Sequence, residues 1–274
     1  MNQKEFNKIL KKVDEIEKPL PTIQFDISNQ KPTIFNSKIG GMAYFPKDME
    51  YPKGECGDFK DKPLVLLAQI NFEEIPNINP FPEKGILQFF IAADDLYGMN
   101  WKDLTTQKNF RIIYHKDIIK DESKLLNFMP KDIDYSMLPF KGEYKIMPNN
   151  PETMYADMNI EAFNDAFEKC SKEVLGEEYS IYDLEDEFEE KLYDRNSRAS
   201  VFIGGYPFFT QSDPRYRSEI MDCNIVLLEI DSLYDKENNI DIMWGDAGTG
   251  VFLIPREKLR NLDFSKVVYN YDCY

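Results

Sequence analysis

The first residues carry a helical pattern of apolar positions. Over residues 4–17 the apolar side chains recur every three or four positions, at Phe6, Ile9, Leu10, Val13 and Ile16. This spacing places them on one face of a helix. Pro19 and Pro21 then interrupt the pattern. We therefore predict an N-terminal helix over about residues 4–17 that docks on the core.

Most of the remaining chain alternates short apolar runs with turn residues, and four of these runs recur later in the same order. The matched blocks are 39–45 (IGGMAYF) with 203–209 (IGGYPFF), 66–71 with 226–231, 85–91 with 248–254, and 111–115 with 266–270. Their β-branched and aromatic composition is typical of strands. We predict one strand-rich unit used twice, in copies spanning about 31–120 and 200–274.

Each copy contains a pair of adjacent glycines, Gly40-Gly41 and Gly204-Gly205, directly before an aromatic run. Glycine adopts positive φ without steric cost, so the pairs fit tight turns. They also fit places where the backbone approaches a ligand closely. The pattern alone leaves both interpretations open.

A helical insert is predicted between the copies, at about residues 120–199. Two apolar stripes with helical spacing follow a proline-punctuated connector: Ile160, Phe163, Phe167, Cys170, Val174 and Leu175, then Ile181, Leu184, Phe188 and Leu192. The second stripe is accompanied by a run of carboxylates at Glu185, Asp186, Glu187, Glu189 and Glu190. This acidic face is either a solvated helix surface or a docking surface for a basic partner or divalent cations.

Together these patterns predict an α+β fold in a single domain over residues 1–274. Its main component is a set of antiparallel sheets from the internally duplicated β-rich unit, with the N-terminal helix and the helical insert added. Whether the two copies share one sheet or form two lobes does not follow from the sequence.

The charge of the chain excludes some partners. A formal net charge of −16 creates a field that repels nucleic acids and anionic membrane surfaces, and it suits a basic protein partner. No apolar stretch is long enough to span a membrane, and residues 1–18 mix Lys with Glu and lack an apolar signal region. We expect a cytoplasmic protein, with no nucleic-acid or membrane partner.

The motifs of common enzymes are missing. The four cysteines lie far apart, so we expect free thiols and no metal site. His115 is the only histidine, and its matched position in the second copy is Asn270, so we interpret it as structural. The chain has no GxSxG, HExxH, EF-hand or Walker motif. We predict no catalytic residues and no cofactor, and lean against an enzyme.

One group of residues in the second copy is a candidate ligand site. FTQSDPRYR and DIMWGDAGTG bring polar groups beside aromatic ones, namely Gln211, Asp213, Arg215, Trp244 and Asp246. An acid, a guanidinium and a flat ring would suit a small ligand if the two loops are neighbours. The same strings are also ordinary turn sequences.

The chain resembles the YwqG-like family, bacterial proteins defined as a domain of unknown function. The similarity rests on IGGMAYFP, KPLVLLAQINFEEIP, FPEKGILQFF, IGGYPFFTQSDPR and MWGDAGTGVFLIPREKLRNLDFSKVVYNYDC. It covers most of the chain from about residue 30 onward. The resemblance implies an α+β fold and a cytosolic bacterial protein. It also implies an association with toxin and immunity loci, and it supplies no catalytic residues.

Three hypotheses of function remain. The first is a non-catalytic binding protein, of immunity type, that covers a basic partner with its acidic insert or with the loops of the second copy. The alternative is a small-ligand receptor or enzyme with a pocket around Asp213, Arg215, Trp244 and Asp246. The third is a purely structural role. The sequence predicts neither the ligand nor the oligomeric state.

Overall fold

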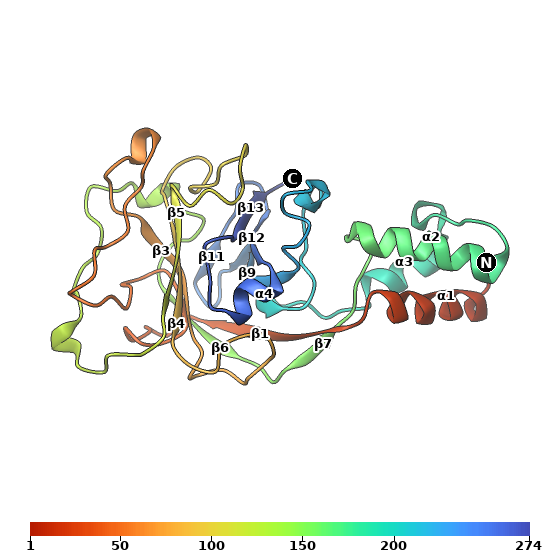
Figure 1. The fold of residues 1–274 in the computed structure, drawn as a ribbon, viewed down its shortest axis with the longest axis horizontal. Helices are drawn as coiled ribbons and strands as arrows, with labels where there is room; N and C mark the ends of the chain where they lie inside the picture. The colour runs from red at the N-terminus through yellow and green to blue at the C-terminus, as the bar shows by residue number, and fades with distance from the viewer.

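The computed structural model describes all 274 residues and contains helices and strands in an α+β arrangement (Figure 1). The helices are α1 (Gln3–Ile16), α2 (Glu161–Leu175), α3 (Asp186–Tyr193) and α4 (Arg256–Arg260). The strands of the first half are β1 (Leu20–Ser28), β2 (Lys38–Ile39), β3 (Val65–Asn71), β4 (Ile86–Ile91) and β5 (Phe110–His115). The strands that follow are β6 (Tyr144–Pro148), β7 (Glu152–Met154), β8 (Val201–Gly204), β9 (Ile225–Asp231), β10 (Leu233–Asp235), β11 (Ile240–Ile242), β12 (Thr249–Ile254) and β13 (Val268–Asp272).

The N-terminal helix forms where the periodicity predicts it. The side chain of Asn2 accepts from the backbone N–H groups of Lys4 and Glu5, and the Glu5 carboxylate accepts from the N–H of Asn2, which fixes the start of α1. The apolar face of α1 packs on the other helices, with the Phe6 ring 4.7 Å from that of Phe188. α1, α2 and α3 thus form a helical lobe at one end of the molecule, beside the sheet body (Figure 1).

Ten strands follow one another in a single antiparallel sheet, in the order β13-β12-β9-β8-β1-β6-β2-β3-β4-β5, and β7 adds to the side of β1. The mainly antiparallel α+β fold is therefore confirmed. Both predicted copies contribute to this one sheet.

The sheet has an internal pseudo-twofold symmetry, because its strand order reads outward from the centre as β1-β8-β9-β12-β13 on one side and as β6-β2-β3-β4-β5 on the other. At the centre, β1 and β6 pair antiparallel, with Phe25 opposite Pro148 and Ile27 opposite Ile146. β1 precedes the first copy in the chain but pairs with β8 of the second. β6 follows the first copy and pairs with its β2. The two halves are thereby joined by exchanged strands.

The strand register corrects one of the four sequence matches. Ile86 lies opposite His115 in the first copy, and its counterpart Thr249 lies opposite Asp272 in the second. The structural counterpart of His115 is therefore Asp272, two residues beyond the predicted Asn270. Matching the apolar runs alone misplaced this block, since a shift of two residues along a strand preserves which side chains face the core.

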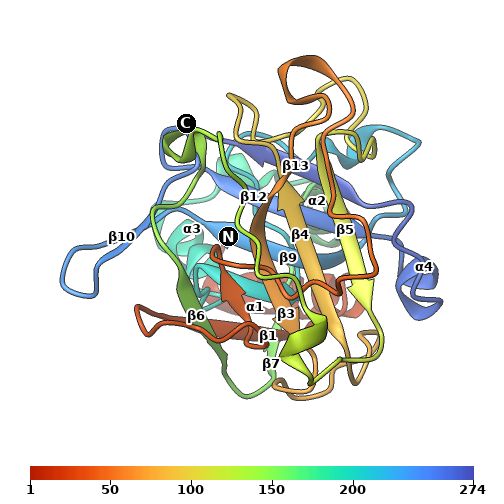
Figure 2. The same ribbon diagram turned by 90° about the vertical axis from the view of Figure 1, so that its left-hand side faces the viewer.

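Large aromatic side chains fill the space between the two halves of the sheet. The Phe89 ring of β4 lies 4.9 Å from the Phe252 ring of β12, and Phe252 stacks on Tyr269 of β13 at 4.4 Å. Figure 2 shows β3, β4 and β5 in front of β9, β12 and β13. Aromatic contacts thus hold the two halves of the sheet together.

The helical insert differs from its prediction in one respect. The spacing of the second stripe predicts one helix, but residues 181–183 form a separate 3-10 turn. Ser180 caps this turn, and its side chain accepts from the N–H of Tyr182. α3 begins only at Asp186. Ile181, Phe188 and Leu192 are still buried, because both pieces face the lobe core.

Both glycine pairs form turns with positive φ, and they also need the absence of a Cβ. Gly40 has a φ of +68° and Gly204 a φ of +71°. A Cβ on Gly40 would lie 2.6 Å from the Gly142 carbonyl oxygen, and one on Gly204 would collide with the Pro21 carbonyl oxygen. The close approach is therefore to the protein's own backbone, just before β6 for Gly40 and within β1 for Gly204.

We predict that Gly204→Ala is clearly more destabilising than Gly57→Ala. Gly57 also has a positive φ of +58°, but an added Cβ there meets no atom within 4 Å. The conformational strain of about 1–2 kcal/mol is common to both substitutions. The backbone collision adds about 1 kcal/mol or more at Gly204 alone. Urea unfolding of the two variants measures the difference, and equal losses would contradict the prediction.

Candidate functional site

The first of two large cavities, about 660 Å³ in volume, lies beside the first glycine pair. It is large enough for a small organic ligand. Its walls come from β2 and the segments on either side of it, the first residue of β3 and the segment before β6. The lining residues with apolar side chains include Pro32, Ile34, Met42, Val65, Met129 and Phe140.

Lys38 is part of the wall of this cavity and is only 2% exposed. Its ammonium group donates to the carbonyl oxygens of Thr33 at 3.0 Å and Met42 at 2.6 Å. No carboxylate lies within 4.0 Å of it. Burial lowers the pKa of Lys38 from 10.5 to about 8, although Glu143 and Glu74 act in the opposite direction. A buried lysine without a counterion is unusual, because an uncompensated charge is costly away from water.

The other charged groups of this cavity are already paired. Lys31 lies 3.6 Å from Glu143, and Lys141 lies 2.8 Å from Asp241. Three lysines and one glutamate therefore line the cavity of a chain whose net charge is −16. The surplus of positive charge is centred on Lys38.

The sequence prediction missed Lys38, although a signal was present. The two copies read Ser37-Lys38-Ile39-Gly40-Gly41 and Val201-Phe202-Ile203-Gly204-Gly205, so a lysine stands where the second copy has a phenylalanine. A charged residue in an apolar strand, at a position where the matching strand has an apolar residue, indicates an unusual buried environment for that charge.

The second cavity, of about 640 Å³, occupies the pseudo-symmetric position. Tyr206 lines it where Met42 lines the first, since each follows its glycine pair by one residue. Leu20 of the second cavity corresponds to Lys141 of the first. Leu20 precedes Pro21, whose carbonyl group lies against Gly204, and Lys141 precedes Gly142, whose carbonyl group lies against Gly40. The duplication thus creates two cavities with different walls.

Two of the five candidate residues line this second cavity together. The Asp213 carboxylate accepts from Nε of Arg215 at 2.8 Å and from its Nη2 at 2.5 Å. It also accepts from the backbone N–H of Arg215, which starts a short 3-10 turn. The acid and the guanidinium are therefore a single preorganised unit.

The other three candidates lie elsewhere. Gln211 donates from its side chain to the Cys273 carbonyl oxygen at 2.8 Å. Trp244 is fully buried, 5.3 Å from the Tyr97 ring and 5.8 Å from the Tyr271 ring. The exposed Asp246 accepts with its backbone oxygen from the N–H of Tyr274. No hydrogen bond or ion pair joins their side chains to the Asp213–Arg215 pair.

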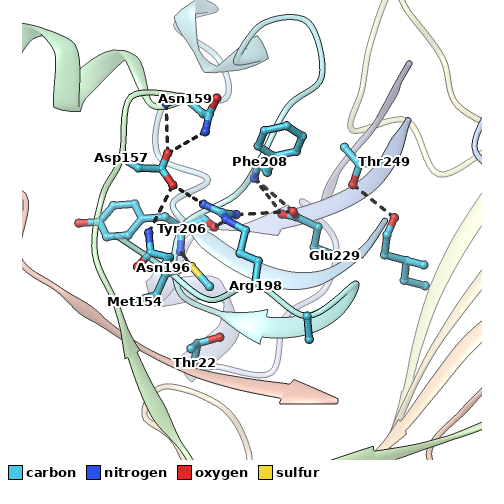
Figure 3. A network of polar contacts seen from close by, with 12 residues as sticks. Thr22, Met154, Asp157, Asn159, Asn196, Arg198, Tyr206, Phe208, Glu229 and Thr249 are labelled. Carbon is cyan, nitrogen blue, oxygen red and sulfur yellow. Dashed lines mark hydrogen bonds and ion pairs between the residues drawn. The ribbon is translucent and has the colours of Figure 1, made fainter. Parts of the chain in front are cut away.

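A polar network holds the second glycine turn and the lobe together (Figure 3). The Arg198 guanidinium donates to Asp157 at 2.9 Å and to the Tyr206 carbonyl oxygen at 3.0 Å, and lies 3.8 Å from the Glu229 carboxylate. Glu229 in turn accepts from the N–H of Phe208 at 3.0 Å. Arg198 therefore fixes Tyr206, a wall of the second cavity, relative to the residues before α2.

The buried ionisable groups of the sheet have displaced pKa values. Burial, and then the nearby Asp231 carboxylate, raises the pKa of Glu229 well above its usual range. Burial lowers the pKa of His115 to about 4. A nitrogen of the His115 ring lies 2.9 Å from the Gln88 side-chain oxygen in the sheet, and the residue lines neither cavity. No group of three or more His, Cys, Asp or Glu residues is arranged to hold a metal ion.

The helices are also too short or too polar to cross a membrane.

A family model described as a domain of unknown function, DUF1963, matches residues 37–273. The chain belongs to the DUF1963 family. The matched region starts one residue before β2, so it includes both glycine turns and leaves out α1 and β1. A search of curated proteins found no match.

We predict that the free energy of unfolding depends on the titration of Lys38. Its pKa is about 8 in the folded protein and 10.5 in the unfolded chain, so between these values the unfolded state binds more protons. Stability therefore rises with pH across this window. Relative to Lys38→Met, the wild type should gain about 2 kcal/mol from about pH 7 to about pH 9.5.

Urea unfolding of both proteins at the two pH values measures this difference. The comparison cancels the titration of the other lysines and tyrosines. A pH-independent difference between the two proteins would show that Lys38 keeps an ordinary pKa.

Proposed function

We propose that this protein is a non-catalytic binding protein whose first cavity holds a small amphipathic molecule with an apolar body and one anionic group. The observation that supports this most is the buried ammonium group of Lys38, which has no counterion in the wall of an apolar cavity. An anionic ligand group would supply the missing charge, and the apolar lining would cover the rest of the ligand.

Two fluorescent probes of nearly the same shape test this proposal. Anilinonaphthalene sulfonate is an apolar anion, and phenylnaphthylamine is its neutral counterpart. We expect the wild type to bind the anion more tightly, because only the anion compensates Lys38. Lys38→Met should weaken binding of the anion by about tenfold, a loss typical of a charge-assisted contact. Binding of the neutral probe should change little.

Lys145→Met is the matched control. Lys145 lies directly opposite Lys38 in the pairing of β6 with β2, but it is not part of the cavity wall. This variant should bind both probes as the wild type does. Equal losses in the two lysine variants, or a wild type that does not prefer the anion, would refute the proposal.

A second candidate function is docking of a basic protein on the helical lobe. Residues 161–194 contain thirteen Asp and Glu residues against three lysines. Only Glu173, Glu178 and Glu187 form ion pairs, which leaves ten carboxylates without one. The lobe also stands apart from the sheet body, where a partner could reach it (Figure 1). An immunity-type role, as the resemblance to YwqG-like proteins implies, would use this surface.

Binding to poly-L-lysine tests whether the lobe concentrates this attraction. We expect a complex that weakens as salt is added, because screening reduces attraction between exposed charges. Neutralising the lobe carboxylates Glu185, Asp186, Glu187, Glu189 and Glu190 to amides should weaken it strongly. The control neutralises the same number of exposed carboxylates on the body: Asp58, Asp95, Glu122, Glu219 and Glu237. Equal effects would show that net charge alone attracts the polycation.

A further inference from the structure

The charged groups that line the second cavity come from two parts of the molecule. The lobe contributes carboxylates at the end of α1 and in the first turns of α2, namely Glu17, Glu161 and Asp165. The sheet body contributes two guanidinium groups, those of Arg215 and Arg256. The remaining cation of the lining, Lys18, is exposed and lies in the connection from α1 to β1.

These charges do not neutralise one another across the cavity. None of the three lobe carboxylates forms an ion pair or a side-chain hydrogen bond, and neither does the Arg256 guanidinium. Arg215 uses Nε and Nη2 for Asp213 and leaves Nη1 without a partner. Groups of opposite charge that share a cavity and remain more than 4 Å apart leave room for a ligand that contacts both.

Arg215 is held as a binding group of fixed geometry. Its side chain is only 15% exposed, and two of its nitrogens donate hydrogen bonds to Asp213. Its guanidinium carbon lies 5.8 Å from the centre of the Phe209 ring. A guanidinium fixed in this way loses little conformational entropy when it binds a carboxylate. The free Nη1 is the group that remains for a ligand.

The rest of the lining decides the class of ligand. Tyr206, Tyr216 and Met221 give the cavity an apolar side between the two charged walls. Its volume of about 640 Å³ exceeds what one amino acid needs. A short peptide with free ends has an ammonium group, a carboxylate and apolar side chains between them.

We infer that the second cavity is a binding site for a short zwitterionic peptide. Its ammonium group faces Glu161 and Asp165 on the lobe, and its carboxylate faces Arg215 and Arg256 on the body. This site is separate from the Lys38 cavity and does not depend on the function proposed there.

Calorimetric titration with the dipeptide Leu-Phe, its N-acetyl form and its C-terminal amide tests the inference. Each modified peptide lacks one of the two charges and keeps the apolar side chains. We expect each to bind roughly tenfold or more weakly than the free dipeptide, the loss typical of one charged hydrogen-bonded contact. Absence of binding by all three forms, or equal affinity for them, would overturn the inference.

Variants then assign each charge to its wall. Arg256→Gln should weaken binding of the free dipeptide by about tenfold. Binding of the amide should be almost unaffected, because the amide has no carboxylate for Arg256 to bind. Asp165→Asn should show the opposite preference, weakening the amide and sparing the N-acetyl peptide. Neither residue has a partner in the structure, so both variants should fold. A uniform effect on all peptides would contradict the assignment.

Arg260→Gln is the control for charge, since Arg260 lies on the same helix, pairs with Glu257 and is not part of the lining. It should bind the dipeptide as the wild type does. Lys38→Met should also keep normal dipeptide affinity, which separates a failure at this site from a failure at the first cavity. A loss in either control would contradict the inferred location of the site.

Discussion

The structure depends on the antiparallel pairing of β1 with β6. Each of these strands belongs to one half of the chain by sequence order and completes the sheet of the other half. Their pairing joins the two halves into one continuous sheet, so the hydrogen-bonded ladder has no break at its centre. Separating the halves would expose two strand edges and the aromatic side chains between them, which makes independent folding of either half unfavourable.

The same exchange brings about the two cavities. Each glycine turn runs against the beginning of an exchanged strand: Gly40 against Gly142, two residues before β6, and Gly204 against Pro21, the second residue of β1. The backbone approaches so closely at both places that no side chain fits between. The space beside each contact is then lined by side chains from both halves, and neither half could form it alone.

The two halves also differ in the buried polar groups beside their glycine turns. A buried carboxamide, Gln69, receives the N–H of Tyr44 in the first half, whereas a buried carboxylate, Glu229, receives that of Phe208 in the second. Arg198 accompanies the carboxylate and ties the second turn to the lobe, so the charge change there is compensated. The Lys38 ammonium group donates to two backbone carbonyl oxygens and forms no ion pair within the protein. The Arg198–Glu229 ion pair therefore supports the fold, whereas under the proposed function an anionic ligand would supply the counterion of Lys38.

The sequence by itself determined the α+β class, the N-terminal helix and the duplicated strands, because these depend on local spacing of apolar residues and on matching runs. Local pattern could not assign Trp244 to the core or Lys38 to a cavity, since a turn string or a lysine looks the same wherever the chain takes it. It also placed the last matched block two residues away from its true register. Those features were decided by the tertiary structure, where hydrogen bonding between distant strands fixes the register and the exchange of β1 and β6 determines which side chains meet.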